Sequence, residues 1–275
     1  RDLHLSIRRQ RQMCIRDRFI SDIHVAWYLR ERSTQTKKKE LSLDERFSEN
    51  ESRGTIRSLL TTLPCRWVNQ KGVVDSLESN KLYQQLIACQ SGLLIPRTLV
   101  SNDPESIVTF SDPKEGLLLK SVGYIRLDED GKKHLYSQRF SHQELSGSPK
   151  AIRRCPVFCQ EYVQKLYEHR VMVIGNKVLA CRIDSQASEQ TKIDWRHYDF
   201  ERVAHVRVEL PQNTQQKLLC FMRAVNLQYG AIDLIETPQG EFIFLEVNPS
   251  GQWGWIADLA GLPIAEAVAE MLENI

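Results

Sequence analysis

The sequence predicts an α+β fold, in which helices and antiparallel strands follow one another without strict alternation. Two kinds of segment lead to this prediction: apolar residues at helical spacing between recognisable helix ends, and short apolar strands joined by turn residues. Of the 275 residues, 41% are hydrophobic and 26% are charged, which is ordinary for a globular protein with a sizeable core.

The charge distribution and hydropathy exclude two classes of partner. The net charge is +2, but residues 1–18 contain six Arg and two Asp, so the remainder is slightly acidic. This is not the concentrated basic face of a nucleic-acid-binding protein. No apolar run approaches the ~20 residues of a membrane span. We therefore expect neither nucleic acid nor a membrane as a partner.

The cysteines indicate a reducing compartment. Their number is odd and no C-x-x-C pair occurs, which favours buried thiols in the cytoplasm over a zinc site or a disulfide framework. The seven cysteines are Cys14, Cys65, Cys89, Cys155, Cys159, Cys181 and Cys220.

The first 75 residues have a weak pattern. Residues 1–18 show neither helical nor strand periodicity, and we interpret them as a segment foreign to the fold, with a basic arm for anionic surfaces as the alternative. Residues 20–29 are apolar enough for a strand or short helix. The polar residues 30–53 predict a solvated loop, followed by a helix near 55–63 that ends at Pro64.

The next elements are predicted from helix ends. Asp75 and Glu78 have the spacing of a capping box, and apolar residues then recur at helical spacing until Gly92. Those apolar residues are Leu82, Leu86 and Ile87. A short strand at 97–100 follows, and Asp103-Pro104 predicts a helix with Asp as N-cap and Pro at N1.

Strands dominate the middle of the chain. They are expected at 117–121, at 133–138 after a turn at Asp130-Gly131, at 157–163, in a hairpin of 171–174 and 177–183, and at 202–209. Pro211 then begins a helix. Residues 231–235 and 241–247 form a second hairpin, and 255–275 are helical with a break at Gly261-Leu262-Pro263.

The second hairpin carries the strongest chemical signal. A tight turn pairs Asp233 with Phe244, and the period of two then places Asp233, Phe244, Glu246 and Asn248 on one face. Two carboxylates and an amide oxygen form an all-oxygen donor set suited to Mg²⁺. A solvated sheet face is the alternative.

Other candidates are weaker when taken singly. Lys120 ends an apolar strand, where a lysine either reaches the surface or meets an anion. Glu168 and Arg170 share a strand face and could pair in solvent. Either Arg196 holds a phosphate bidentately or the neighbouring Trp195 fills the core.

Together these residues resemble an ATP-grasp ligase, most like the microviridin-type or graspetide ligases that modify ribosomal peptides and are related to RimK-like ligases. The resemblance runs from about residue 23 to residue 275. Its most specific segment is Phe244–Ile256, FLEVNPSGQWGWI, preceded by Gly230-Ala231-Ile232-Asp233.

The resemblance implies an ATP-grasp fold of two α+β subdomains that grip ATP. Residues 19–75 would be the remnant of a truncated N-terminal domain, 76–162 the central subdomain and 163–275 the C-terminal subdomain. The implied cofactors are ATP and Mg²⁺. A precursor peptide is the implied partner, and a homodimer is left open.

The resemblance also implies roles for individual residues. The implied Mg²⁺ ligands are Asp233, Glu246 and Asn248. The implied ATP-binding residues are Lys120 on the phosphates, Glu161, Tyr162 and Val163 at the adenine, Glu168 at the ribose, and Arg196. Arg196 and Arg170 are the implied catalytic residues, and Lys81 matches a helix lysine near the phosphates.

The implied reaction is ATP-dependent formation of ester or amide crosslinks between side chains of a precursor peptide, through an acyl phosphate. One alternative is a RimK-like ligase that adds amino acids to a small molecule or a protein tail. Another is an ATP-binding module without catalysis.

Overall fold

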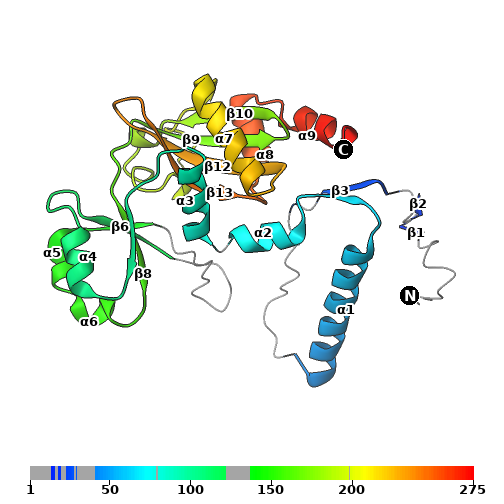
Figure 1. Ribbon diagram of the computed structural model, residues 1–275, viewed down its shortest axis with the longest axis horizontal. Coiled ribbons are helices and arrows are strands. Elements are labelled where there is room, and N and C mark those ends of the chain that lie inside the picture. Colours follow the sequence, from blue (N-terminus) through cyan, green and yellow to red (C-terminus); the bar gives the residue numbers. More distant parts are fainter. Residues whose placement is uncertain are drawn as a thin grey trace.

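The computed structural model describes residues 14–15, 18–19, 23–27, 29, 41–78, 80–121, 137–197 and 199–275. Within these ranges the chain forms two large antiparallel sheets and two small two-stranded sheets, with helices packed against them (Figure 1). The fold class is therefore α+β, as predicted.

The larger sheet has five strands in the order β11-β10-β9-β12-β13. Its strands are β9 (Tyr167–Ile174), β10 (Lys177–Ile183), β11 (His205–Val208), β12 (Tyr229–Glu236) and β13 (Phe242–Asn248). The predicted hairpin of β9 and β10 is confirmed, with a turn at Gly175-Asn176. Gly175 has a φ of 57°, which glycine adopts without steric cost.

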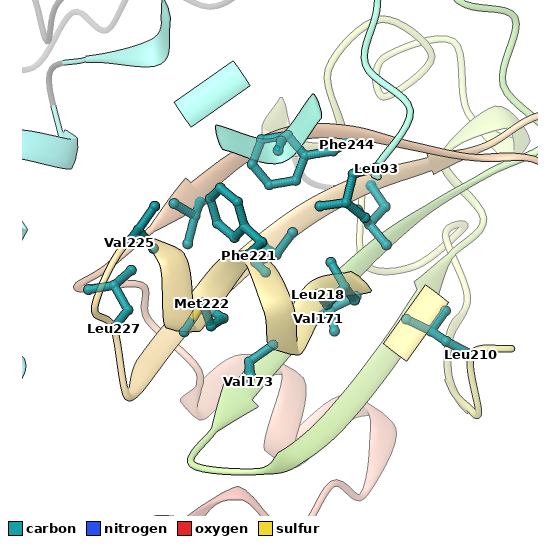
Figure 2. Close-up of a cluster of buried hydrophobic side chains, with 14 of the residues drawn as sticks. Leu93, Val171, Val173, Leu210, Leu218, Phe221, Met222, Val225, Leu227 and Phe244 are labelled. Carbon is teal, nitrogen blue, oxygen red and sulfur yellow. The ribbon is translucent and has the colours of Figure 1, made fainter. Parts of the chain in front are cut away.

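Both faces of this sheet are covered. On one face, α7 (Gln212–Ala224) lies along the strands, and its Leu218, Phe221 and Met222 are buried against Val171 and Phe244 (Figure 2). On the other face, a second cluster includes Met172, Ile174 and Tyr229 of the sheet together with residues of two helices. These helices are α8 (Gly254–Ala260) and α9 (Ile264–Glu273), which confirms the predicted break between them.

The second large sheet has four strands in the order β5-β8-β6-β7. They are β5 (Thr98–Ser101), β6 (Leu117–Lys120), β7 (Gln138–Phe140) and β8 (Val157–Glu161). One face packs on three short helices, α4 (Pro104–Phe110), α5 (His142–Ser146) and α6 (Pro149–Ile152). Because side chains alternate, Leu117 and Leu119 join that cluster, while Leu118 and Lys120 point to the opposite face.

The N-terminal part contributes smaller elements. Strands β1 (Cys14–Ile15) and β2 (Arg18–Phe19) pair with each other, and β3 (Val25–Trp27) lies parallel to β4 (Arg66–Val68). Helix α1 (Leu43–Thr62) connects β3 and β4 and extends away from the large sheets (Figure 1). Helices α2 (Lys71–Glu78) and α3 (Lys81–Gln90) then lead to the four-stranded sheet, and both contact β13.

Two helix predictions are wrong in this part. Helix α1 begins at Leu43 instead of near 55, because Ser42 and Glu45 form a capping box within the segment predicted as a loop. Asp75 is not an N-cap: it lies inside α2 and pairs with Lys71. Asn80 caps α3 instead, by accepting a hydrogen bond from the amide of Tyr83.

The apolar spacing in α3 does not mark its buried face. Leu82 and Leu86 are 46% and 55% exposed, whereas Gln84, Gln85 and Ala88 are buried. The two glutamines are buried because their side chains hydrogen-bond to the backbone of β13, at Val247 and Leu245. A satisfied amide can thus replace an apolar side chain at a helix–strand contact.

The predicted register of the β12–β13 hairpin is also wrong. Leu234 pairs with Phe244, but the register shifts by one residue at the next pair, so that Asp233 faces Glu246. This bulge at Leu245 moves Phe244 to the face covered by α7 and leaves Asp233 and Glu246 directly opposite each other on the other face.

The remaining outcomes are mixed. The strands predicted at 97–100, 117–121, 157–163 and 202–209 and the helix after Asp103-Pro104 are confirmed within two or three residues at their ends. Helices α5 and α6 were not predicted. The Asp130-Gly131 turn and most of the strand at 133–138 lie outside the described residues. Among those described, no helix is long and apolar enough to cross a membrane.

The cysteine prediction is only partly right. Six cysteines are described as free thiols, but only Cys159 and Cys181 are buried. Cys89, Cys155 and Cys220 are exposed, because each lies on the solvent side of its helix or loop.

Candidate active site

A cleft between the two large sheets collects charged side chains from both of them. It holds about 630 Å³, including space open to solvent. Its charged lining residues are Lys81, Lys120, Glu161, Lys165, Glu168, Asp194, Arg196, Asp233 and Glu246. Eight of the eleven residues that the resemblance places at the site therefore line one cleft: Lys81, Lys120, Glu161, Val163, Glu168, Arg196, Asp233 and Glu246.

Three neighbouring strands place charged residues in a row at the wall of this cleft. Arg170 on β9 pairs with Asp233 on β12, and Asp233 faces Glu246 on β13. The Nη1 atom of Arg170 donates a hydrogen bond of 2.8 Å to Oδ1 of Asp233. Arg170 itself is buried beside Asp233 and is not a lining residue, so its contact with the cleft runs through that carboxylate.

The two facing carboxylates have different electrostatic surroundings. Burial raises the pKa of Asp233, and the negative charge of Glu246 adds to this effect despite the adjacent Arg170. Burial acts in the same direction on Glu246, but the cations Lys81, Arg196 and Lys120 outweigh it and lower its pKa. The cations thus favour the ionised form of Glu246, whereas burial disfavours the ionised form of Asp233.

The carboxylates of Asp233 and Glu246 form a donor set that fits a Mg²⁺ ion. Asp233 and Glu246 repel each other across the ladder, and a divalent cation between them would remove that repulsion. Mg²⁺ takes one or two protein carboxylates and completes its shell with water and substrate phosphates. Among the described His, Cys, Asp and Glu residues, no cluster of three or more could hold a metal. The fit therefore rests on these two carboxylates.

Asn248, the third predicted ligand, is placed differently. It pairs with Ala231, on the same face of the sheet as Asp233 and Glu246. Its Oδ1 atom accepts a hydrogen bond of 3.2 Å from the amide of Ser250, and the residue does not line the cleft. In this arrangement Asn248 shapes the loop that follows β13.

Three cations lie near the carboxylate of Glu246. The Nζ atom of Lys81, the first residue of α3, lies 3.4 Å from Oε2 of Glu246, and Nη1 of Arg196 lies 3.6 Å from Oε1. Lys120 enters from the end of β6 in the other sheet. Burial lowers the pKa of Lys120 to about 8, and the nearby charges of Lys81 and Arg196 add to this decrease. Clustered cations are suited to a polyanion such as a triphosphate.

The guanidinium of Arg196 is held in place by Asp194. Its Nε and Nη2 atoms donate to the two carboxylate oxygens at 2.7 and 2.5 Å, and its amide donates to Oδ1 at 3.1 Å. Although burial opposes ionisation, Asp194 raises the pKa of Arg196, so the group stays charged. Trp195 lies between Asp194 and Arg196 in the sequence. Its side chain is buried, and its ring centroid lies 5.1 Å from that of Trp255. Trp195 therefore fills the core, as one alternative predicts, and Arg196 lines the cleft. A bidentate contact of Arg196 with a phosphate stays a prediction.

The other end of the cleft is formed by the end of β8 and the segment after it. The carboxylate of Glu161 is bound by the side chain and the amide of Arg97, at 2.7 and 2.9 Å. Val163 lines the cleft. Tyr162 does not, since its ring lies beneath the guanidinium of Arg139 at 3.9 Å.

A buried ion pair lines this end of the cleft and was not predicted. The Nζ atom of Lys165 donates to Oε1 of Glu168 at 2.8 Å, and the two side chains are 3% and 5% exposed. Burial raises the pKa of Glu168, while Lys165 opposes that rise. The sequence contained one weak signal, a lysine three residues before a carboxylate, but nothing indicated that both would be buried. Asp194 was likewise assigned no role from the sequence.

The loop after β13 packs closely on this row. A Cβ atom at Gly251 would lie 2.3 Å from Cβ of Ala231 and 2.8 Å from Nη2 of Arg170. Tyr229 also donates from its hydroxyl to the carbonyl of Gly251 at 2.5 Å. Glycine is therefore required here for close approach of backbone to the charged row.

Comparison with known proteins identifies the fold. No protein-family model matches the sequence, and no curated protein matches it. Solved structures do match. The macrocyclase MdnC of Microcystis aeruginosa MRC, bound to its precursor peptide MdnA, is 28% identical with a TM-score of 0.78, over 94% of this chain and 80% of MdnC. A RiPP-associated ATP-grasp ligase of Chryseobacterium gregarium, in complex with ADP and a leader and core peptide, is 28% identical with a TM-score of 0.81, over 92% of this chain and 77% of that one.

A more distant match shares the fold alone. The D-alanine–D-alanine ligase of Bacillus anthracis, complexed with ATP, is 15% identical with a TM-score of 0.53, over 80% of this chain and 73% of the ligase. The chain thus has the ATP-grasp fold, and its structural relatives include a macrocyclase bound with a precursor peptide and a RiPP-associated ATP-grasp ligase in complex with a leader and core peptide.

Proposed function

We propose that this ATP-grasp chain is an ATP-dependent ligase that crosslinks side chains of a ribosomal precursor peptide. The observation that carries the proposal is the row of Asp233 and Glu246 facing Lys81, Lys120 and Arg196 across one cleft. A nucleoside triphosphate presents both the negative charge that these cations attract and the oxygens that Mg²⁺ binds. The structural relatives bound to precursor peptides support the choice of a peptide as substrate.

Each part of the cleft then has a role. Asp233 and Glu246 would hold Mg²⁺, with Asn248 kept as a predicted third ligand, and the ion would neutralise phosphate charge. Lys81, Lys120 and Arg196 would contact the phosphates. Glu161, Tyr162 and Val163 would flank the adenine, Tyr162 through its backbone because its ring faces Arg139. Glu168 would accept hydrogen bonds from the ribose.

The reaction would proceed in two transfers. An oxygen of a substrate carboxylate attacks the γ-phosphorus, the bond to the β-phosphate oxygen breaks, and an acyl phosphate and ADP result. A substrate hydroxyl or amine then attacks the acyl carbon, losing its proton, and inorganic phosphate leaves. Lys120 and Arg196 would stabilise the negative charge that develops on the transferred phosphoryl group, because both are cations in a partly dehydrated site and Arg196 is held in place by Asp194. Arg170 would act by orienting Asp233.

We also propose a reducing compartment for this chain. Six free cysteines are described, which favours a reducing environment such as the cytoplasm.

A mass spectrum of a treated peptide tests the proposal. The chain is incubated with ATP, Mg²⁺ and a short peptide, rich in Thr, Lys, Asp and Glu, that is encoded beside its gene. For the wild-type chain, we expect the peptide to lose one water per bond formed. Asp233→Asn should show no such loss, and its ADP release should be about a thousandfold lower than that of the wild type. The matched control is Glu209→Gln, which neutralises an exposed carboxylate outside the cleft and should retain activity.

Two other outcomes would contradict the proposal. An unchanged peptide together with ADP release on free amino acids would indicate the ligase of small substrates. Absence of ADP with peptides and amino acids alike, from a chain that still binds ATP, would indicate the binding module.

A further inference from the structure

We infer that Lys165 is a positioning residue that couples the nucleoside end of the cleft to the loop that carries Arg196. Its Nζ atom donates one hydrogen bond to Oε1 of Glu168 on β9, at 2.8 Å, and another to the carbonyl of Ile193, at 2.9 Å. One ammonium thus joins two segments that are 25 residues apart in the chain, and the inference rests on the proposed function because it assumes ATP in this cleft.

The burial of this group calls for a function. Placing an ammonium and a carboxylate at 3% and 5% exposure removes both ions from water, and this desolvation opposes their attraction. An apolar pair of similar size would hold β9 in place at least as well. What an apolar pair cannot do is present carboxyl oxygens to the cleft, which Glu168 lines, and bind a backbone carbonyl at the same time.

A short path leads from Lys165 to the phosphate end. Ile193 is followed by Asp194, whose carboxylate grips Arg196 through the side-chain and backbone bonds described above. Arg196 in turn approaches Glu246 at 3.6 Å. Because three hydrogen bonds tie Arg196 to Asp194, a displacement of the Ile193 backbone would move the guanidinium with it.

Lys165 is also close in sequence to the nucleoside end. It follows Glu161 and Val163, which line the cleft, by only a few residues. The hydroxyl of buried Ser185 supports Glu168 from another segment, so Lys165 is not its only partner and loss of the lysine need not collapse the carboxylate. The specific contribution of Lys165 is the bond to the Arg196 loop.

Calorimetry with two nucleotides tests this coupling without a peptide. The dissociation constants of Mg–ADP and Mg–AMPPNP are measured for the wild-type chain, Glu168→Gln and Lys165→Met/Glu168→Gln. Their ratio reports how well the site, including Arg196, holds a third phosphate. We expect Glu168→Gln to weaken both nucleotides by the same factor and leave the ratio unchanged. The double variant should lose a further factor on the order of tenfold in the ratio, because Arg196 is displaced.

The double variant also separates positioning from folding. Removing both charges leaves no unpaired buried ion, so its melting temperature should stay near that of the wild type, whereas Lys165→Met alone should melt earlier. Lys192→Met is the matched control, since this half-exposed lysine lies on the same loop and pairs with Glu189 outside the cleft. It should change neither constant.

The possible results distinguish a failure of this inference from a failure of the proposed function. If the double variant has the same ratio as Glu168→Gln, Lys165 is only a counter-ion and the inference is wrong, with the proposed function untouched. A wild-type chain that binds both nucleotides equally well also overturns the inference. A wild-type chain that binds neither nucleotide overturns the proposed function and the inference together.

Discussion

The two large sheets meet the cleft in different ways. The five-stranded sheet has a hydrophobic cluster on each face, and its charged residues Arg170, Asp233 and Glu168 are buried and already paired. The four-stranded sheet has helices on one face, and its other face lines the cleft with Leu118, Lys120 and Gln160. Lys120 has no hydrogen-bond or ion-pair partner among the residues that the structure describes.

This difference separates two tasks. In the five-stranded sheet, charges lie in a rigid ladder and can keep their geometry before any ligand arrives, which is the condition for efficient electrostatic stabilisation. In the four-stranded sheet, Lys120 lies at the end of β6, and burial lowers its pKa. We therefore expect substitutions in the first region to damage geometry or folding, and changes in the second to act through charge alone.

After the loss of the Asp233 carboxylate, the largest effect should come from removing Arg196, the cation that Asp194 holds in place. Arg196→Met should lower the rate of ADP release at saturating substrates by about a hundredfold, because a preorganised donor to the transferred phosphoryl group is lost. A coupled assay of ADP release measures it. Arg202→Met is the control, because that side chain is 75% exposed and its guanidinium comes no closer than 4.0 Å to the carboxylate of Asp199. Equal rates for Arg196→Met and the wild type would show that preorganised charge in this half is dispensable.

The rigidity of the same half can be tested without a ligand. Gly251→Ala should lower the free energy of unfolding by about 1–3 kcal/mol, since the new methyl group must displace Ala231 or Arg170. Gly254→Ala, three residues on, meets no atom within 4 Å and should not destabilise the chain. Chemical denaturation of both variants measures the difference. Similar stabilities would mean that the loop moves freely and that the row is less rigid than the packing implies.

The smallest effect concerns the four-stranded half and depends on pH. With a pKa of about 8, Lys120 is an ammonium at pH 7 and loses its charge as the pH rises through 8. About one-tenth stays protonated at pH 9, so the affinity for Mg–ATP should fall up to about tenfold between pH 7 and pH 9. Lys120→Arg should abolish this fall, because arginine stays charged. Titration calorimetry at both pH values is the measurement, and a fall that persists in Lys120→Arg would assign it to another group.

Much of the fold could be predicted because its signals are local. The Gly175-Asn176 turn, the Asp103-Pro104 helix start and the break before Pro263 each depend on a few adjacent residues. The capping box of Ser42 and Glu45 was equally local but was hidden by the charged composition around it. The bulge at Leu245 has no local signal, because it results from packing Phe244 against α7 while Glu246 stays at the cleft.

The site shows the same limit. The types of its residues were predicted, and most of those residues line one cleft. The pairings were not, because Arg170–Asp233 and Lys165–Glu168 depend on burial that spacing does not report. Asn248 lies on the same face of the sheet as Asp233 and Glu246, as predicted, but it does not line the cleft. The roles of these residues and the subdomain boundary at 162/163 stay predictions.

The uneven exposure of the cysteines gives the molecule natural attachment points for spectroscopy. Exposed Cys155 follows α6 beside the four-stranded sheet, and exposed Cys220 lies on α7 over the five-stranded sheet. Buried Cys159 and Cys181, with pKa values raised to about 11 and about 12, would react slowly with maleimides, because the thiolate is the nucleophile. Once Cys14, Cys65 and Cys89 are changed to Ser, a donor and an acceptor dye on the remaining pair would follow the two halves in solution as nucleotide is added.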